Sequence, residues 1–167
     1  MKNLYRSGQW SVTLGIILMM VMAFLYSSCE KDHDIPLGTF SVLIDGKERS
    51  FNTEAKAEHL PVEGGYGIKI HGYKGEAGAT NELSVIIASG KAISLKTYIQ
   101  GAGGDAVKIQ YMVYMLFWYD EYSSLKATIT ISEINSTRVR GTFSGTLVYQ
   151  GSTSQKVLSE GVFHVSF

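Results

Sequence analysis

Apolar and polar residues alternate along most of the chain after residue 37, which is the pattern of β-strands that bury one face. Turn residues separate the alternating stretches, among them Asp45-Gly46, a dipeptide favoured in two-residue hairpins. About nine or ten strands at such spacings predict an all-β fold, either an antiparallel β-sandwich or a barrel-like fold. Only residues 54–60 favour a turn or two of helix. We expect strands at 39–44, 47–51, 66–71, 83–88, 93–100, 125–131, 139–149 and 157–167.

Residues 106–119, AVKIQYMVYMLFWY, depart from this alternation, because a strand through them would be apolar on both faces from Tyr111 onward. One explanation is a long central strand that is buried on both sides or bent by a bulge. The other is an exposed aromatic platform, since large exposed apolar patches mark binding sites and Tyr and Trp combine a flat apolar face with a polar edge. The candidate binding residues are then Tyr111, Met112, Tyr114, Leu116 and Trp118.

The start of the chain has the order of a secretory signal peptide, with Lys2 and Arg6 before an uncharged apolar run at 12–25. This run is short for a bilayer span of about 20 residues, although an uncleaved anchor stays open if flanking residues are counted. LYSSC, which ends at Cys29, resembles a bacterial lipobox, whose cysteine receives lipid. Because two or more acyl chains hold a protein stably on a membrane, we expect lipidation of Cys29 and the membrane as a partner.

Other roles for Cys29 fit the sequence less well. The chain has one cysteine, so it has no internal disulfide. Because the charged residues EKDHD follow it directly, Cys29 is unsuited to a position in the core or in a catalytic pocket. We therefore predict a signal peptide at 1–28, a tether at 29–37 and a β-sandwich domain at 38–167.

Several motifs resemble those of known bacterial lipoproteins. EKDHD resembles the charged export signal that sends Bacteroidetes lipoproteins to the outer face of the outer membrane. FSVLIDGKERSF, ITISEINSTRVRGTFSGTLV and VLSEGVFHVSF resemble the first hairpin and the closing strands of a family of small, uncharacterised Bacteroidetes lipoproteins. The resemblance implies a β-sandwich-like outer membrane lipoprotein, either periplasmic or surface-exposed, and it assigns no catalytic residues.

Charge and histidine spacing argue against several kinds of site. The net charge is zero, and no basic patch suited to nucleic acid is visible. No histidine pair has metal-ligand spacing, and His71 and His164 fall on the polar, solvated phase of their strands. The glycine-rich residues 101–105 precede a strand instead of a helix, so we interpret them as a loop and not as a phosphate site. We therefore expect no metal and no cofactor.

Three carboxylates are the candidates for a glycosidase: Asp120, Glu121 and Glu160. Adjacent residues of a strand point to opposite faces, which makes Asp120 and Glu121 a poor pair, so we assign no catalytic residue. The sequence predicts a lipid-anchored envelope protein that is a non-catalytic binding module for a glycan or a protein partner. Two alternatives stay open: a structural or accessory subunit of a surface assembly, and a glycan hydrolase with carboxylates on neighbouring strands.

Overall fold

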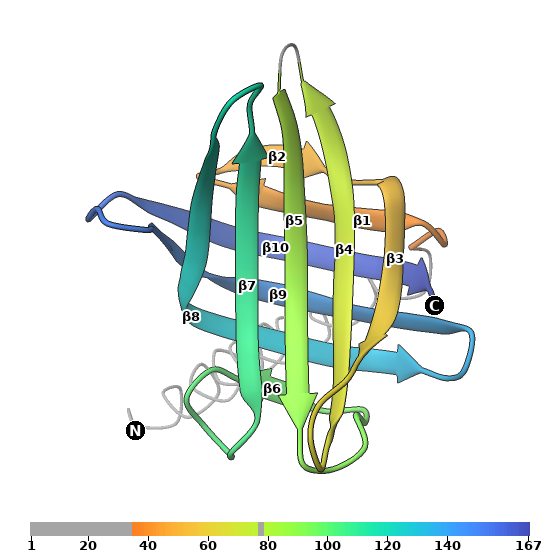
Figure 1. The fold of residues 1–167 in the computed structure, drawn as a ribbon. Helices are drawn as coiled ribbons and strands as arrows, with labels where there is room; N and C mark the ends of the chain where they lie inside the picture. Colours follow the sequence, from red (N-terminus) through yellow and green to blue (C-terminus); the bar gives the residue numbers. More distant parts are fainter. Residues whose placement is uncertain (1–34, 77–78) are drawn as a thin grey trace, which may run out of the picture. The chain divides into compact units, whose positions relative to one another are not determined.

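The computed structural model describes residues 35–76 and 79–167, which form a ten-stranded unit without helices (Figure 1). The predicted all-β, barrel-like fold is thereby confirmed. The predicted signal peptide and Cys29 lie outside the described residues. The strands are β1 (Thr39–Ile44), β2 (Lys47–Ser50), β3 (Thr53–Leu60), β4 (Tyr66–Glu76), β5 (Ala79–Ser89), β6 (Thr97–Ile99), β7 (Ala106–Tyr114), β8 (Tyr119–Ile134), β9 (Arg138–Tyr149) and β10 (Gln155–Ser166).

Seven of the strands close into a barrel in the order β3-β4-β5-β7-β8-β9-β10. Neighbours in this ring are antiparallel except at the closing pair, where β10 lies parallel to β3 through Ser166 and Lys56. β1 and β2 extend the sheet from β10, and β6 pairs with β8. Figure 1 shows β4, β5 and β7 crossing in front of β1, β9 and β10, so the barrel has two crossing layers.

β8 belongs to both layers because it bends at a bulge. From Tyr119 to Ser123 it pairs with β7 in the front layer, and further along it pairs with β6. Its register with β9 shifts between Ser124 and Lys126, which leaves Leu125 as the extra residue. An extra residue bends a strand and increases its twist, and strands turn the corners of such barrels in this way. The first part of β8 is thereby joined to the front layer as a hairpin with β7.

Alternate residues of the barrel strands and of β1 point inward and form the hydrophobic core. Fully buried members from the front layer are Ile68, Ile70, Leu83, Val85, Ile87 and Ile109, and members from the layer behind are Phe40, Ile129, Val139, Leu147, Phe163 and Val165. Burial of about a dozen large apolar side chains is the main favourable term in the folding of such a domain. The outward residues of the same strands are free to form a binding surface.

Two cross-strand Phe–Gly pairs set the contact between β9 and β10. Phe163 lies opposite Gly141, and Phe143 lies opposite Gly161. A Cβ atom on Gly141 would lie 2.6 Å from the Phe163 ring, and one on Gly161 would lie 2.7 Å from the Phe143 ring. The two rings stack with their centroids 6.3 Å apart. Each ring therefore occupies the space that a side chain on the opposite residue would need.

Residues 54–60 belong to β3, so the prediction of a short helix there was wrong. The register of β3 with β4 shifts between Thr53 and Lys56, where Glu54 has a φ of 53°. Beyond this bulge Ala57 is buried in the core, while Glu58 faces outward. Alanines among charged residues suit a helix as well as a strand, and here the hydrogen-bonded pairing with β4 decides the conformation.

The Phe–Gly contact can be tested by adding one methyl group. We expect Gly141→Ala to lower the free energy of unfolding by about 1–3 kcal/mol, because the new Cβ would overlap the Thr130 carbonyl oxygen and the Phe163 ring. Gly90→Ala is the matched control, since nothing lies within 4 Å of a Cβ at that position. Urea unfolding of both variants measures the difference. Equal stabilities would contradict the proposed role of the contact.

Candidate functional site

The apolar run at 106–119 is a hairpin and not one continuous strand. β7 ends at Tyr114 and β8 begins at Tyr119, so residues 115–118 form the turn between them. The Met115 amide donates to the Trp118 carbonyl oxygen at 2.9 Å and closes this turn. The expectation of one long strand was therefore wrong. This turn could not be predicted, because it has none of the Gly, Pro, Asn or Asp residues that mark most turns.

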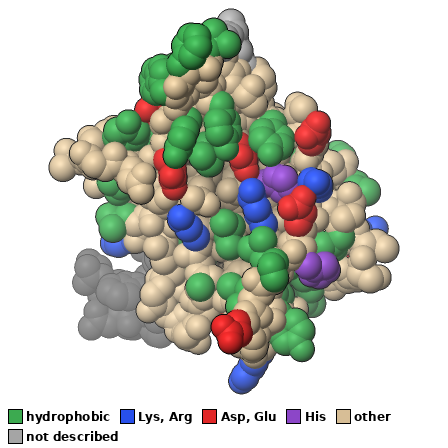
Figure 2. Space-filling model, viewed as in Figure 1, with side chains coloured by type: hydrophobic (Ala, Val, Ile, Leu, Met, Phe, Trp, Pro, Cys, Tyr) green, Lys and Arg blue, Asp and Glu red, His purple; other side chains and the backbone are tan. Residues whose placement is uncertain are grey.

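We call residues 115–118 the hairpin tip. Its two central side chains are almost completely exposed, Leu116 at 87% and Phe117 at 95% of their surface, and Trp118 is about half exposed. Figure 2 shows apolar side chains gathered at the upper end of the molecule, where β7 and β8 meet in Figure 1. Large apolar side chains in such positions are uncommon and mark contact sites. The structure thus exposes two of the predicted binding residues, Leu116 and Trp118.

Tyr111 does not belong to this surface. It is only 8% exposed and lies in the core, with its ring centroid 6.0 Å from that of Phe51. Its inclusion among the binding residues was wrong, because it has the inward phase of β7. Met112 and Tyr114 have the opposite phase and are half-buried on the outside of the barrel.

The outside of the front layer combines these residues with polar and charged side chains. We call this surface the outer face; Figure 2 shows it from the front, with apolar side chains next to acidic, basic and histidine side chains. Its members are Lys56 and Glu58 of β3, Lys69, His71 and Tyr73 of β4, Glu82 and Ser84 of β5, Gln110, Met112 and Tyr114 of β7, and Tyr119, Glu121 and Ser123 of β8.

Glu82 is the centre of the hydrogen bonds on the outer face. Its side chain is largely buried, and its two oxygens accept separate bonds from Lys69 Nζ and from the Tyr114 hydroxyl, each at 2.9 Å. Burial and the bond to Glu82 raise the pKa of Tyr114 to about 12. The hydroxyl therefore stays protonated and continues to donate at any physiological pH, which holds the Tyr114 ring in place.

His71 lies between two carboxylates. Its Nδ1 is 3.9 Å from a Glu82 oxygen and its Nε2 is 3.3 Å from a Glu58 oxygen. The hydrogen bond from Lys56 lowers the pKa of Glu58. His71 is buried, so the expectation that it is solvated was wrong. The prediction that His71 points to the polar side of its strand was correct, but long side chains of neighbouring strands cover it.

Glu121 continues the network across β8. One of its oxygens accepts bonds from Gln110 Nε2 at 2.9 Å and from the Ser123 hydroxyl at 3.1 Å. Tyr119, on the same face, lies next to Tyr114 with ring centroids 6.2 Å apart. The face therefore places two tyrosine rings beside a fixed carboxylate, an amide and a hydroxyl.

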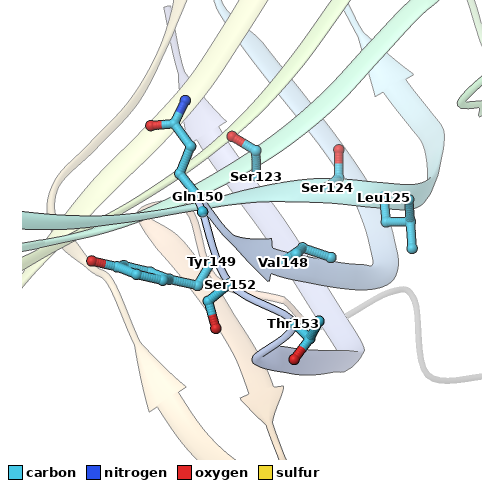
Figure 3. A pocket seen from close by; sticks show the side chains of 9 residues that line it. Ser123, Ser124, Leu125, Val148, Tyr149, Gln150, Ser152 and Thr153 are labelled. Atoms are coloured by element: carbon cyan, nitrogen blue, oxygen red, sulfur yellow. The ribbon is translucent and has the colours of Figure 1, made fainter.

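An open hollow of about 800 Å³ adjoins the outer face at Ser123 (Figure 3). Most of the residues around it carry a hydroxyl or an amide: Ser123, Ser124, Tyr149, Gln150, Ser152 and Thr153. In Figure 3 the two serines of β8 lie across from Ser152 and Thr153. We call it the hydroxyl hollow. The backbone N–H of Gln150 donates to the backbone carbonyl oxygen of Glu121 at 3.1 Å, which joins the hollow to the strand that carries Glu121.

The carboxylates considered for catalysis lie apart from one another. Asp120 aligns with Val113 and Glu121 with Met112, so the two acids occupy opposite faces of β8. Asp120 forms a hydrogen bond with Tyr149, which raises the pKa of that tyrosine. Glu160 lies in a bulge of β10, with a φ of 51° and an exposed side chain.

Two further histidines in the described part of the chain have separate structural contacts. His59 stacks on Phe167 with a centroid distance of 4.6 Å, and His164 Nδ1 lies 2.6 Å from the Ile35 carbonyl oxygen. Within residues 35–76 and 79–167, no group of three or more His, Cys, Asp or Glu side chains is placed to hold a metal ion. The same part of the chain contains no helix of the length and apolar character needed to cross a membrane.

Comparisons with known protein families, with curated proteins and with solved structures found no match to this chain. The assignment of function therefore depends on the residues themselves.

The hydrogen bond between Tyr114 and Glu82 predicts that the pKa of Tyr114 depends on Glu82. The pKa of Tyr114 is raised from 10.0 to about 12, so its contribution to stability is complete below pH 10.0 and is lost as the pH rises through about 12. Glu82→Gln removes the carboxylate charge and should bring this pKa back toward 10.0. NMR titration of tyrosines labelled at Cζ measures both values, with Tyr114→Phe to assign the signal. A Tyr114 pKa that is the same in both proteins would contradict the contact.

Proposed function

We propose that this protein is a lipid-anchored module of the bacterial cell envelope that binds a glycan without catalysis. The ligand lies on the outer face, against Tyr114 and Tyr119, and continues past Glu121 into the hydroxyl hollow. One observation carries the proposal: half-exposed tyrosine rings adjoin carboxylate, amide and hydroxyl groups that are already fixed by hydrogen bonds.

Sugar rings need this combination of groups. Their C–H faces stack on flat aromatic side chains, and their hydroxyls both donate and accept hydrogen bonds. On the outer face Glu121 is an acceptor, Gln110 can both donate and accept, and Ser123 does the same through its hydroxyl. Because these groups are held by one another, little side-chain freedom is lost when a ligand binds.

The charge distribution favours a glycan over a protein partner on this face. The centres of protein–protein interfaces are depleted in charged residues. Here the centre of the face holds the partly buried ion pair of Lys69 and Glu82, with His71 beside it. A polar ligand that lies over the tyrosines leaves these groups paired, whereas an apolar protein surface would cover them without adding partners.

The membrane attachment in this proposal comes from the lipobox that ends at Cys29. Acyl chains on that thiol and on the new amino terminus give more than one hydrophobic anchor, which is what stable attachment requires. The charged residues after Cys29 and the resemblance to Bacteroidetes lipoproteins support the outer membrane as its location. No catalytic residue is part of the proposal.

Glycan binding can be tested with two tyrosines of equal exposure. Tyr119, on the outer face, is 56% exposed, and Tyr66, at the far end of β4, is 57% exposed. We expect Tyr119→Ala to weaken binding about tenfold through loss of one stacking contact, whereas Tyr66→Ala leaves it unchanged. A glycan array identifies the ligand, and calorimetry with that ligand gives the affinities. If the parent protein retains no glycan, or both variants lose affinity equally, the site is wrong.

Lipidation is tested by replacing the thiol. Cys29→Ser should abolish incorporation of radiolabelled palmitate in growing bacteria, because the serine hydroxyl cannot form the thioether to diacylglycerol. Incorporation is the informative measurement, since an unprocessed apolar run at 12–25 would keep the variant in the membrane fraction. Label retained in the variant would show that the lipid is elsewhere or that Cys29 is not the acceptor.

A further inference from the structure

We propose that the hairpin tip is a second membrane contact, which inserts Leu116 and Phe117 into the interfacial region of a lipid bilayer. The inference rests on the proposed lipid anchor, because the anchor keeps the tip close to a membrane. It concerns residues 115–118, whereas the proposed glycan site lies on the outer face.

Along the hairpin, apolar side chains come first, then an amphipathic ring, then charged side chains, which is the order of groups across a membrane interface. At the end are Leu116 and Phe117, which are uncharged and almost completely exposed. Trp118 follows, and it is about half exposed. Tryptophan side chains are enriched at the level of lipid headgroups. Along this part of the chain the charged residues begin only at Asp120 and Glu121.

The end of the hairpin has no charged residues. No Asp, Glu, Lys or Arg occurs in the eleven residues 109–119, between Lys108 and Asp120. Transfer of this segment into an interface therefore removes no charge from water. Removal of Leu116 and Phe117 from water is favourable in proportion to their apolar area.

The backbone of the tip limits how deep it goes. Its turn is closed by the hydrogen bond from the Met115 amide to the Trp118 carbonyl oxygen. The peptide groups of Leu116 and Phe117 protrude beyond that bond, and unpaired peptide groups are not tolerated in the hydrocarbon core. The geometry therefore fits shallow insertion, in which side chains reach the acyl boundary and the turn stays among the headgroups.

A bilayer suits the tip better than a protein does. A stable protein interface buries about 800 Å² on each partner and involves roughly 20 residues or more. The tip has four residues and projects from the barrel, while the surface behind it is charged. A fluid bilayer needs no complementary pocket, and a few apolar side chains are enough when a second anchor is present.

The proposed tether makes a weak contact effective. Five residues separate Cys29 from Ile35, where the described residues begin, and a chain of this length spans at most about 20 Å. The barrel therefore stays close to the surface that holds the lipid, and insertion of the tip becomes an intramolecular event at high effective concentration. Two contacts, unlike one, also fix the orientation of the outer face with respect to the membrane.

Trp118 is a built-in probe for the experiment. The chain has two tryptophans, and Trp10 lies in the proposed signal peptide, so Trp118 is the source of tryptophan fluorescence in the processed protein. The lipidated protein, purified from bacterial membranes, is reconstituted into phosphatidylcholine vesicles that contain lipids brominated on their acyl chains, near the headgroup or near the chain end. Bromine quenches tryptophan only on close approach. We expect quenching by the shallow bromines and a blue shift of the emission.

The variants separate insertion from mere proximity to the membrane. Leu116→Ser with Phe117→Ser should reduce the inserted fraction about tenfold, and quenching should fall with it. Leu95→Ser, at a residue 63% exposed and outside the tip, is the matched control and should change nothing. Circular dichroism checks that all variants are folded.

Three results would overturn the proposal, and the first two concern the bilayer alone. Trp118 emission that is equal in brominated and plain vesicles means that the tip stays in water, even though the protein is attached. If quenching is the same in the variant with both serines as in the parent protein, the tip is near the bilayer without inserting. Both outcomes leave glycan binding on the array and palmitate incorporation at Cys29 unaffected, so failure of the tip is distinguishable from failure of the proposed function. Protection of Trp118 only when another envelope protein is added would also overturn it and assign the tip to that protein.

Discussion

The reciprocal Phe–Gly pairs between β9 and β10 are the contact on which the rest of the barrel depends. Phe163 covers Gly141 and Phe143 covers Gly161, and the two rings stack in the core. Phe40 from β1 packs on Phe143, with centroids 5.6 Å apart. The aromatic cluster holds three neighbouring strands of the rear layer together, while the seam between β10 and β3 contributes a single register pair. Continuous hydrogen bonding therefore does not close the barrel at this seam, where His59 of β3 stacks on Phe167 just after β10.

Because the core is filled in this way, the proposed glycan site lies outside it. The inward positions of the front layer are occupied by aliphatic side chains, so the outward positions and the loops are left for the proposed ligand. Glu82 organises the outward positions because it binds Lys69 and Tyr114 at once. The bulge at Leu125 then brings the hydroxyl hollow alongside this surface. The rigid core thus supplies the fixed frame that a preorganised polar surface requires.

The alternation of the sequence predicted most of the strands but not their limits. Residues 54–60 were expected to be helical, because their composition suits either conformation and only pairing with β4 makes them a strand. Residues 106–119 were expected to be one strand, because a turn built from Met115, Leu116, Phe117 and Trp118 carries no turn signal. The exposed positions Leu116 and Trp118 were predicted as candidates, whereas Tyr111 proved to be core. Burial of His71 could not be predicted, since it depends on side chains from other strands.

The sequence alone determined the β class, the expected strand positions and the prediction that Cys29 is an attachment point, because period-two alternation and the resemblance to a lipobox are local patterns. Tertiary structure decided which apolar residues are exposed and which polar residues act together. Glu58, His71, Glu82 and Tyr114 are spread over four strands, and their distances follow from register and not from spacing along the chain. Exposure of the hairpin tip likewise depends on where β8 turns back along β7. Local pattern specifies a strand, but only the pairing of strands specifies a surface.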